Sequence, residues 1–211
     1  MVPWLVLQIG GLFTPGLLDD VDSVYTEVAR EMLARHDYVT PMVDGIRFFD
    51  KPPLMYWLAA GSMRLFGQHD WAARLPLALG VLGLMLAVYA LGIRFYADYS
   101  PREAPDRAGL YAAWATGICV GTYLYTRFYI PEILVALWMT VGVHLFLVAL
   151  DRLERDQSAL VPSLGFAAVL GFSVLTKGMI GIVFLLGFAA LYLVWAGKLP
   201  VLRRLPLWRA T

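Results

Sequence analysis

A series of long apolar runs, separated by short polar links, limits what this chain can fold into. A helix of about 20 apolar residues crosses the hydrocarbon core of a bilayer. Backbone polar groups in lipid find no water, so apolar runs of this length are expected to be helical. We predict six spans, over residues 2–16, 75–96, 110–126, 132–150, 160–176 and 179–197. The pattern predicts an all-α polytopic membrane bundle.

Composition supports this class and excludes others. The chain is 60% hydrophobic and 16% charged, whereas a soluble domain has about a quarter of its residues charged. Mean hydropathy is +0.66. The formal net charge of +1 provides no basic field, so no nucleic-acid partner is expected. Cys119 is the only cysteine and rules out an intramolecular disulfide.

Basic residues in the links predict the orientation. Short cytoplasmic links of membrane proteins are enriched in lysine and arginine. Here such residues lie in the links after the second and fourth spans and in the tail: Arg102, Arg107, Arg152, Arg155, Lys198, Arg203, Arg204 and Arg209. The opposite, extracytoplasmic face then receives the long loop 17–74, the link 127–132 and Lys177. Residues 1–16 lack a basic start and a small-residue cleavage site, so no signal peptide is expected.

The loop 17–74 is polar and rich in patterns. It begins with Asp19, Asp20 and Asp22, followed by an amphipathic segment with apolar residues at helical spacing from Val21 to Leu33. We expect a helix at the membrane surface there, and a cap at the start of this helix is an alternative role for Asp20 and Asp22. Asp44-Gly45 predicts a tight turn. Pro52-Pro53 is expected to open a second helix, Leu54–Phe66, which Gly67 ends.

Uncommon polar residues therefore gather on the extracytoplasmic face. We expect them to surround one cavity: Asp20, Asp22, Asp50, Lys51, Arg127, Glu132 and Lys177. Each also has a plain structural reading. Lys51 can extend to the interface, Asp50 can pair with Arg47 or Lys51, and the last three can mark the ends of spans.

Several segments in order resemble a known family. They are residues 25–33, 37–41 and 45–57, then Arg74-Leu75-Pro76 and Leu175-Thr176-Lys177-Gly178. The first three resemble the first extracytoplasmic loop of membrane glycosyltransferases of the GT-C fold, in the superfamily of protein O-mannosyltransferases and lipid A aminoarabinose transferases. The last two also resemble that family. Because members are typically more than twice as long, the resemblance implies an N-terminal portion of such an enzyme.

The resemblance implies partners and site residues. It implies a polyprenyl-phosphate-linked sugar donor and a hydroxyl acceptor on a protein or lipid, at the periplasmic or exterior face of a bacterial inner membrane. The family's catalytic aspartate falls at Val21 in a gap-free match, so Asp20 or Asp22 must supply the carboxylate. Asp50-Lys51-Pro52 stands where the family has Glu-Lys-Pro, which implies a divalent metal ion at Asp50 and donor phosphate at Lys51. Arg127 and Lys177 are further candidates for binding the donor phosphate.

The expected reaction suits these residue types. A carboxylate takes the proton of the attacking hydroxyl, and a lysine, an arginine or a metal stabilises the leaving phosphate. A single displacement of this kind inverts the anomeric carbon. Two alternatives stay open: a catalytically inactive scaffold or truncated homologue, and a transporter subunit. A transporter needs ionisable groups within its spans, and apart from His144 the predicted spans are expected to lack them.

Overall fold

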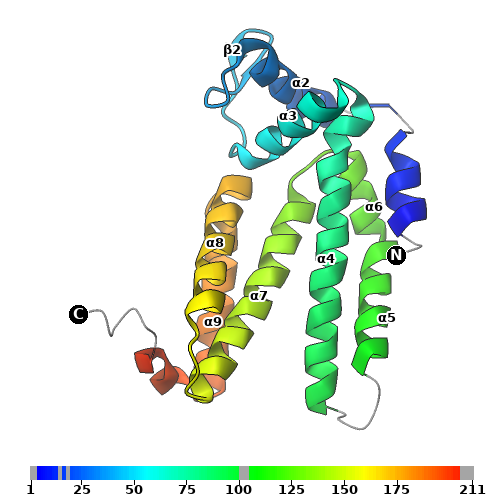
Figure 1. Ribbon diagram of the computed structural model, residues 1–211. Helices are drawn as coiled ribbons and strands as arrows, with labels where there is room; N and C mark the ends of the chain where they lie inside the picture. Colours follow the sequence, from blue (N-terminus) through cyan, green and yellow to red (C-terminus); the bar gives the residue numbers. More distant parts are fainter. Residues whose placement is uncertain (1–3, 14–15, 18–19, 100–104, 205–211) are drawn as a thin grey trace.

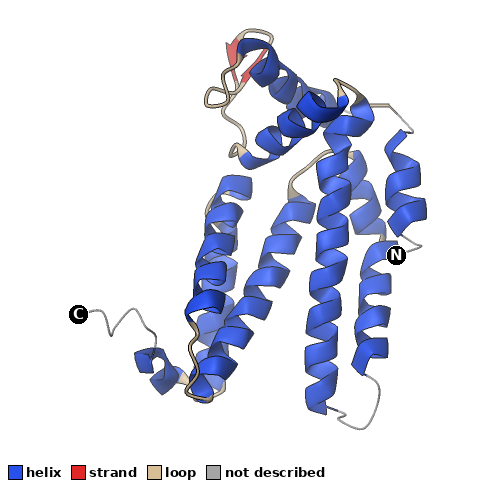
Figure 2. Ribbon diagram, viewed as in Figure 1, coloured by secondary structure: helices blue, strands red, loops and turns tan. Residues whose placement is uncertain are grey.

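The computed structural model describes residues 4–13, 16–17, 20–99 and 105–204. Most of these residues form a bundle of roughly parallel helices, and two further helices lie across one end of it (Figure 1). Among the described residues, the strands form one short hairpin (Figure 2). The prediction of an all-α membrane bundle is therefore confirmed.

The cap across the bundle consists of α2 (Asp20–Arg35), β1 (Met42–Val43), β2 (Ile46–Arg47) and α3 (Leu54–Phe66). As predicted, α2 buries one apolar face, including Val28 and Met32. The predicted turn joins the two strands, and both Asp44 (φ 51°) and Gly45 (φ 76°) are left-handed. Gly67 ends α3 with φ 89°, which a residue with a side chain rarely adopts.

The bundle contains six α-helices, which are α4 (Asp70–Tyr99), α5 (Pro105–Ile118), α6 (Val120–Arg127), α7 (Glu132–Glu154), α8 (Leu160–Lys177) and α9 (Ile180–Trp195). Three of them, α4, α7 and α8, are long and apolar enough to cross a membrane, and α9 is a shorter apolar helix. Short helical segments precede and follow: η1 (Leu5–Ile9), η2 (Gly10–Phe13) and η3 (Leu199–Arg204). The count of six spans and their boundaries stays a prediction.

The run predicted over 110–126 is not one continuous helix. Cys119 is extended (φ −62°, ψ 135°) and separates α5 from α6. A side chain near the break binds the backbone there. The Thr122 hydroxyl donates to the carbonyl of Cys119 at 2.7 Å. Such local bonds let a broken helix remain in an apolar environment.

One apolar core joins the cap to the bundle. It combines residues of α2, α3 and α4 with the link before α7 and α7 itself; examples are Met32, Tyr56, Leu77, Tyr129 and Leu134. The Tyr129 hydroxyl donates to the carbonyl of Met55 at 3.1 Å. This packing holds the link 128–131 directly beneath α3, so the start of α7 faces the cap.

Candidate functional site

Asp50 and Lys51 lie in the loop that leads from the hairpin into α3. Lys51 Nζ lies 3.1 Å from a carboxylate oxygen of Asp50. The Tyr25 hydroxyl, from α2, donates to the same carboxylate at 2.5 Å. Tyr25 is itself fixed by ring contacts with Phe48 and Tyr56. The loop thus presents a lysine and a carboxylate, and Tyr25 of the cap orients the carboxylate.

A second lysine–carboxylate pair lies at the cap-facing end of the bundle. Lys177, the last residue of α8, forms an ion pair with Glu132, the first residue of α7. Each side chain is 32% exposed. An acid at a helix start and a base at a helix end are both favoured by the helix dipoles. The Trp138 ring nitrogen donates to the Thr176 hydroxyl at 2.9 Å and ties α7 to α8 next to the pair.

Tyr25 and Asp50 shift each other's protonation. Burial raises the pKa of the Tyr25 hydroxyl above its ordinary value, and the hydrogen bond to Asp50 raises it further. The hydrogen bond from Tyr25, and next the one from Lys51, hold the pKa of Asp50 below its usual range. Tyr25 therefore stays protonated and Asp50 ionised at neutral pH. Both pairs lie where the cap meets the ends of α7 and α8, because α3 contacts α8 and the Tyr129 hydroxyl binds α3. Asp50, Lys51, Glu132 and Lys177 are called here the lysine site.

Asp22 is placed differently from these groups. Its carboxylate lies 3.3 Å from Arg74 of α4, and the two side chains are 3% and 1% exposed. Arg74 also donates to the carbonyl of Gly16 at 3.0 Å. Asp22 therefore anchors the start of α2. Asp20 is the first residue of that helix, and its side chain lies outside the part that the structure describes.

Arg127 contacts the N-terminal segment. Its guanidinium donates to the carbonyl of Leu7 at 3.3 Å and lies 4.7 Å from the centre of the Tyr123 ring. A side chain at Gly11 would collide with it, because a Cβ there would lie 1.3 Å from Arg127 Nη2. Arg127 thus rests on η2, and the contacts found for it differ from those of the lysine site.

Comparison with known proteins shows the family of the chain. The profile of the family described as dolichyl-phosphate-mannose-protein mannosyltransferase matches residues 50–209, more than half of the chain. The chain belongs to this mannosyltransferase family.

Relatives and solved structures extend the likeness to the N-terminal residues. An undecaprenyl phosphate-alpha-4-amino-4-deoxy-L-arabinose arabinosyl transferase of Pseudomonas fluorescens is 30% identical over 95% of this chain and 34% of its own length. An uncharacterized protein of Aquifex aeolicus is 30% identical over 88% of this chain and 38% of its own. The chain therefore spans about a third of the length of these relatives.

Two crystal structures of ArnT from Cupriavidus metallidurans share the fold. The apo structure has a TM-score of 0.78 and 26% identity, and covers 98% of this chain and 36% of that one. The structure bound to undecaprenyl phosphate has a TM-score of 0.73 and 25% identity, and covers 97% and 36%. This member of the mannosyltransferase family therefore has the GT-C membrane fold and is an integral membrane protein.

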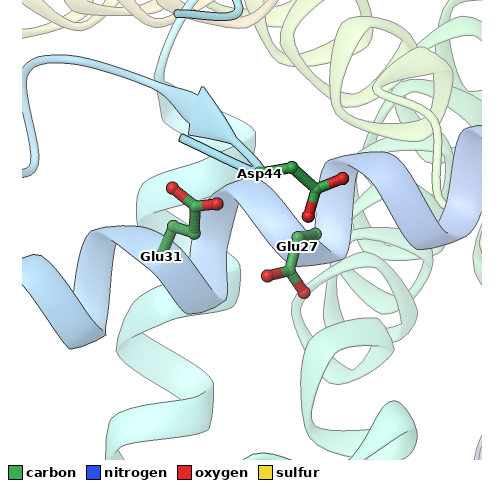
Figure 3. Close-up of side chains that lie close together, drawn as sticks. All are labelled: Glu27, Glu31 and Asp44. Carbon is green, nitrogen blue, oxygen red and sulfur yellow. The ribbon is translucent and has the colours of Figure 1, made fainter. Parts of the chain in front are cut away.

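The described residues do not form a metal site around Asp50. Both of its oxygens accept hydrogen bonds, from Tyr25 and Lys51, and within the described ranges Asp50 belongs to no group of three side chains that could hold a metal ion. Three other carboxylates do cluster, since oxygens of Glu27, Glu31 and Asp44 lie within 4.8 Å of one another (Figure 3). Arg30 binds Glu27 at 2.8 Å there. What the structure supports is an acidic cluster at the hairpin, distinct from Asp50.

One ionisable residue of the spans was missed in the sequence. Arg94 lies within the predicted span 75–96 and forms an ion pair with Asp151 of α7 at 2.7 Å. His144 is therefore not the sole ionisable residue in the predicted spans. Arg94 falls within an apolar stretch, and its pairing with the far end of another helix has no local signal. The pair links α4 to α7 in the half of the bundle remote from the lysine site (Figure 1).

Proposed function

We propose that this chain carries the donor-phosphate side of an inverting glycosyltransferase that moves a sugar from a polyprenyl-phosphate carrier to a hydroxyl of a lipid or protein. The observation that supports it is the lysine site, where two partly exposed lysines are each paired with a carboxylate, one in the cap and one at the end of the bundle that faces the cap. The names of the arabinosyl transferase relatives and the undecaprenyl phosphate complex of a similar fold favour a polyprenyl phosphate donor.

In the proposed reaction the acceptor oxygen attacks the anomeric carbon of the donor sugar. The new carbon–oxygen bond forms as the bond to the phosphate oxygen breaks, so the anomeric carbon is inverted. The hydroxyl proton passes to a carboxylate, and polyprenyl phosphate leaves with the bonding electron pair. Lys51 and Lys177 stabilise the charge that develops on the leaving phosphate. A phosphate replaces a carboxylate partner at each lysine, which partly exposed ion pairs allow.

We assign the proton acceptor to Asp20 and a positioning role to Asp22. Asp22 shares a buried ion pair with Arg74, so taking up a proton would break a pair that the fold needs. Asp20 lies at the same end of α2 and is the remaining candidate. Arg127 contributes to the proposed site indirectly, by holding η1 and η2 against α6.

We place the lysine site at the extracytoplasmic face. Exposed arginines of the short links, Arg107, Arg152 and Arg155, lie at the opposite end of the bundle (Figure 1), as the positive-inside rule requires for the cytoplasmic side. A divalent ion at Asp50 would have to compete with the positive charge of Lys51 for the carboxylate, and no step of the proposal passes through a metal.

Transfer assays with radiolabelled polyprenyl-phosphate sugars test the function. Lipid A and a protein acceptor are offered separately to the chain in liposomes. We expect Asp20→Asn to abolish transfer while undecaprenyl phosphate still binds. Asp22→Asn should lower transfer only in proportion to the loss of folded protein. Full transfer by both variants would overturn the base assignment. Donor binding without any transfer by the unmodified chain would instead favour the inactive scaffold.

A further inference from the structure

A dry cavity lies between three helices at the end of the bundle away from the cap. It has a volume of about 300 Å³ and is lined by α7, α8, α9 and Val201 of η3. Its walls are almost wholly apolar, with rings from Phe146 and Phe166 at one side. This is about twice the volume of an engineered apolar cavity of about 150 Å³ that binds benzene. Protein interiors are close-packed and rarely contain empty spaces of this size, so we expect a ligand to fill the cavity.

The cavity opens at the outer surface of this bundle. Its back wall is buried and includes Leu150, Leu153 and Leu193. Ala167 of α8 and Leu186 of α9 line it as well, and both are exposed on the outer surface of the bundle. An apolar chain from the surrounding bilayer can therefore enter between α8 and α9 without unfolding either helix.

Charges surround the same end of the bundle. Arg152 and Arg155 are both exposed. Arg152 directly precedes Leu153, which lines the cavity, and Arg155 lies two residues after Leu153. Lys198 pairs with Glu154 at 2.7 Å, and Asp151 pairs with Arg94. The same segment holds two further arginines, Arg152 and Arg155, and one further acid, Asp156, so positive charge is in excess at this end of the bundle. Basic groups between helix ends at the membrane surface attract anionic lipid head groups.

We infer that the cavity holds one acyl chain of an anionic phospholipid, whose head group lies at Arg152 and Arg155. A chain-shaped occupant matches the apolar walls and the lateral opening, and the arginines account for a negative head group. The inference does not depend on the proposed glycosyl transfer, because the lysine site lies at the other end of the bundle (Figure 1). Such a lipid would stabilise the packing of α9 on α7 and α8.

Native mass spectrometry tests the inference. The chain is released from nanodiscs of equimolar phosphatidylglycerol and phosphatidylcholine, and the lipids that remain bound are counted. We expect the unmodified chain to retain phosphatidylglycerol in preference. Ala167→Phe should lower retention about tenfold, because its ring displaces roughly two methylene groups of the chain. Ala168→Phe is the matched control, since Ala168 is equally exposed on α8 but does not line the cavity.

A second pair of variants tests the head group. Removing both arginines (Arg152→Ala with Arg155→Ala) should abolish the preference for phosphatidylglycerol, whereas Arg107→Ala at the same end should keep it. Equal retention by Ala167→Phe and Ala168→Phe would overturn the inference, and so would an unmodified chain that retains no lipid. Displacement of phosphatidylglycerol by undecaprenyl phosphate in preference to further phosphatidylglycerol would overturn the choice of occupant.

Discussion

Two ion pairs at the same end of the molecule differ in their contact with solvent. The Asp22–Arg74 pair is sealed, with both side chains at most 3% exposed, whereas Glu132 and Lys177 are each 32% exposed. A sealed pair cannot change partner without leaving a buried charge, while an exposed lysine can release its carboxylate at little cost. Exposure therefore separates the pair that builds the site from the pair that is available to a ligand.

The residue types follow the same division. Arg74 and Arg127 are buried and also donate to backbone carbonyls, of Gly16 and Leu7, which the several donors of a guanidinium permit. Lys51 and Lys177 are partly exposed point charges. Arginine holds the N-terminal segment in place, and lysine is left for an anionic ligand.

The largest expected effect is that of Arg74→Ala. It leaves the carboxylate of Asp22 buried without its arginine partner, so we expect the free energy of unfolding in detergent to fall by about 3–5 kcal/mol. Denaturant titration followed by circular dichroism measures the change. Arg30→Ala is the control, because Arg30 pairs with Glu27 on an exposed helix face and should cost less than about 1 kcal/mol. Equal losses in the two variants would remove the distinction between sealed and exposed pairs.

Gly11→Ala should have the next largest effect. The new methyl group would occupy the position of Arg127 Nη2 and force the guanidinium away from Leu7. We expect a loss of about 1–3 kcal/mol, typical of overpacking. The control is Gly187→Ala in α9, where a Cβ meets no atom within 4 Å and helix propensity should add up to about 1 kcal/mol of stability. Unchanged stability of Gly11→Ala would show that Arg127 does not depend on this contact.

A smaller effect is expected for Tyr25→Phe, which removes the main cause of the low pKa of Asp50. A carboxyl with a lowered pKa in the folded chain stabilises it above the unfolded-state value of about 3.9, and this contribution is lost as pH falls through the lower, folded-state pKa. In the variant the folded-state pKa of Asp50 should rise toward the unfolded-state value, so the contribution is smaller and its loss is complete at a higher pH. The change should stay below about 1 kcal/mol, because the Asp50 side chain is 40% exposed.

The shift in Asp50 is measured by nuclear magnetic resonance titration of its carboxyl carbon. Tyr38→Phe serves as the comparison, since it removes a hydroxyl from the same cap while the Tyr38 carbonyl still binds Trp57. If Tyr25→Phe left the titration of Asp50 unchanged, the hydrogen bond would not control that carboxylate.

Elements with local signals could be predicted from the sequence. The apolar periodicity of α2, the left-handed turn at Asp44-Gly45 and the limits of α3 at Pro53 and Gly67 all depend on neighbouring residues. The break at Cys119 had no such signal, because it lies within an apolar run and is stabilised by the hydroxyl of Thr122. Patterns of hydropathy alone do not reveal a helix that is interrupted but remains apolar.

The pairing of Asp50 with Lys51 was among the alternatives that the sequence offered, whereas the pairing of Glu132 with Lys177, 45 positions apart, was not. Asp50, Lys51, Glu132 and Lys177 were expected on one face from the order of the links. The roles of Asp22 and Arg127 depend on partners more than 50 positions away, Arg74 and Leu7, which no local pattern reports. Tyr25 looked like an ordinary core residue on the apolar face of α2, and its hydrogen bond to Asp50 became visible only in three dimensions.

The most direct test compares Lys177→Ala with Lys198→Ala. The two lysines have similar ion pairs and similar exposure, 32% and 33%, at opposite ends of the bundle. Each variant should lose less than about 1 kcal/mol of stability. We predict that the dissociation constant for undecaprenyl phosphate in detergent rises about tenfold in Lys177→Ala, the cost of roughly one charged hydrogen bond, and stays within about twofold in Lys198→Ala. Equal binding by the two variants would contradict a donor-phosphate site beneath the cap.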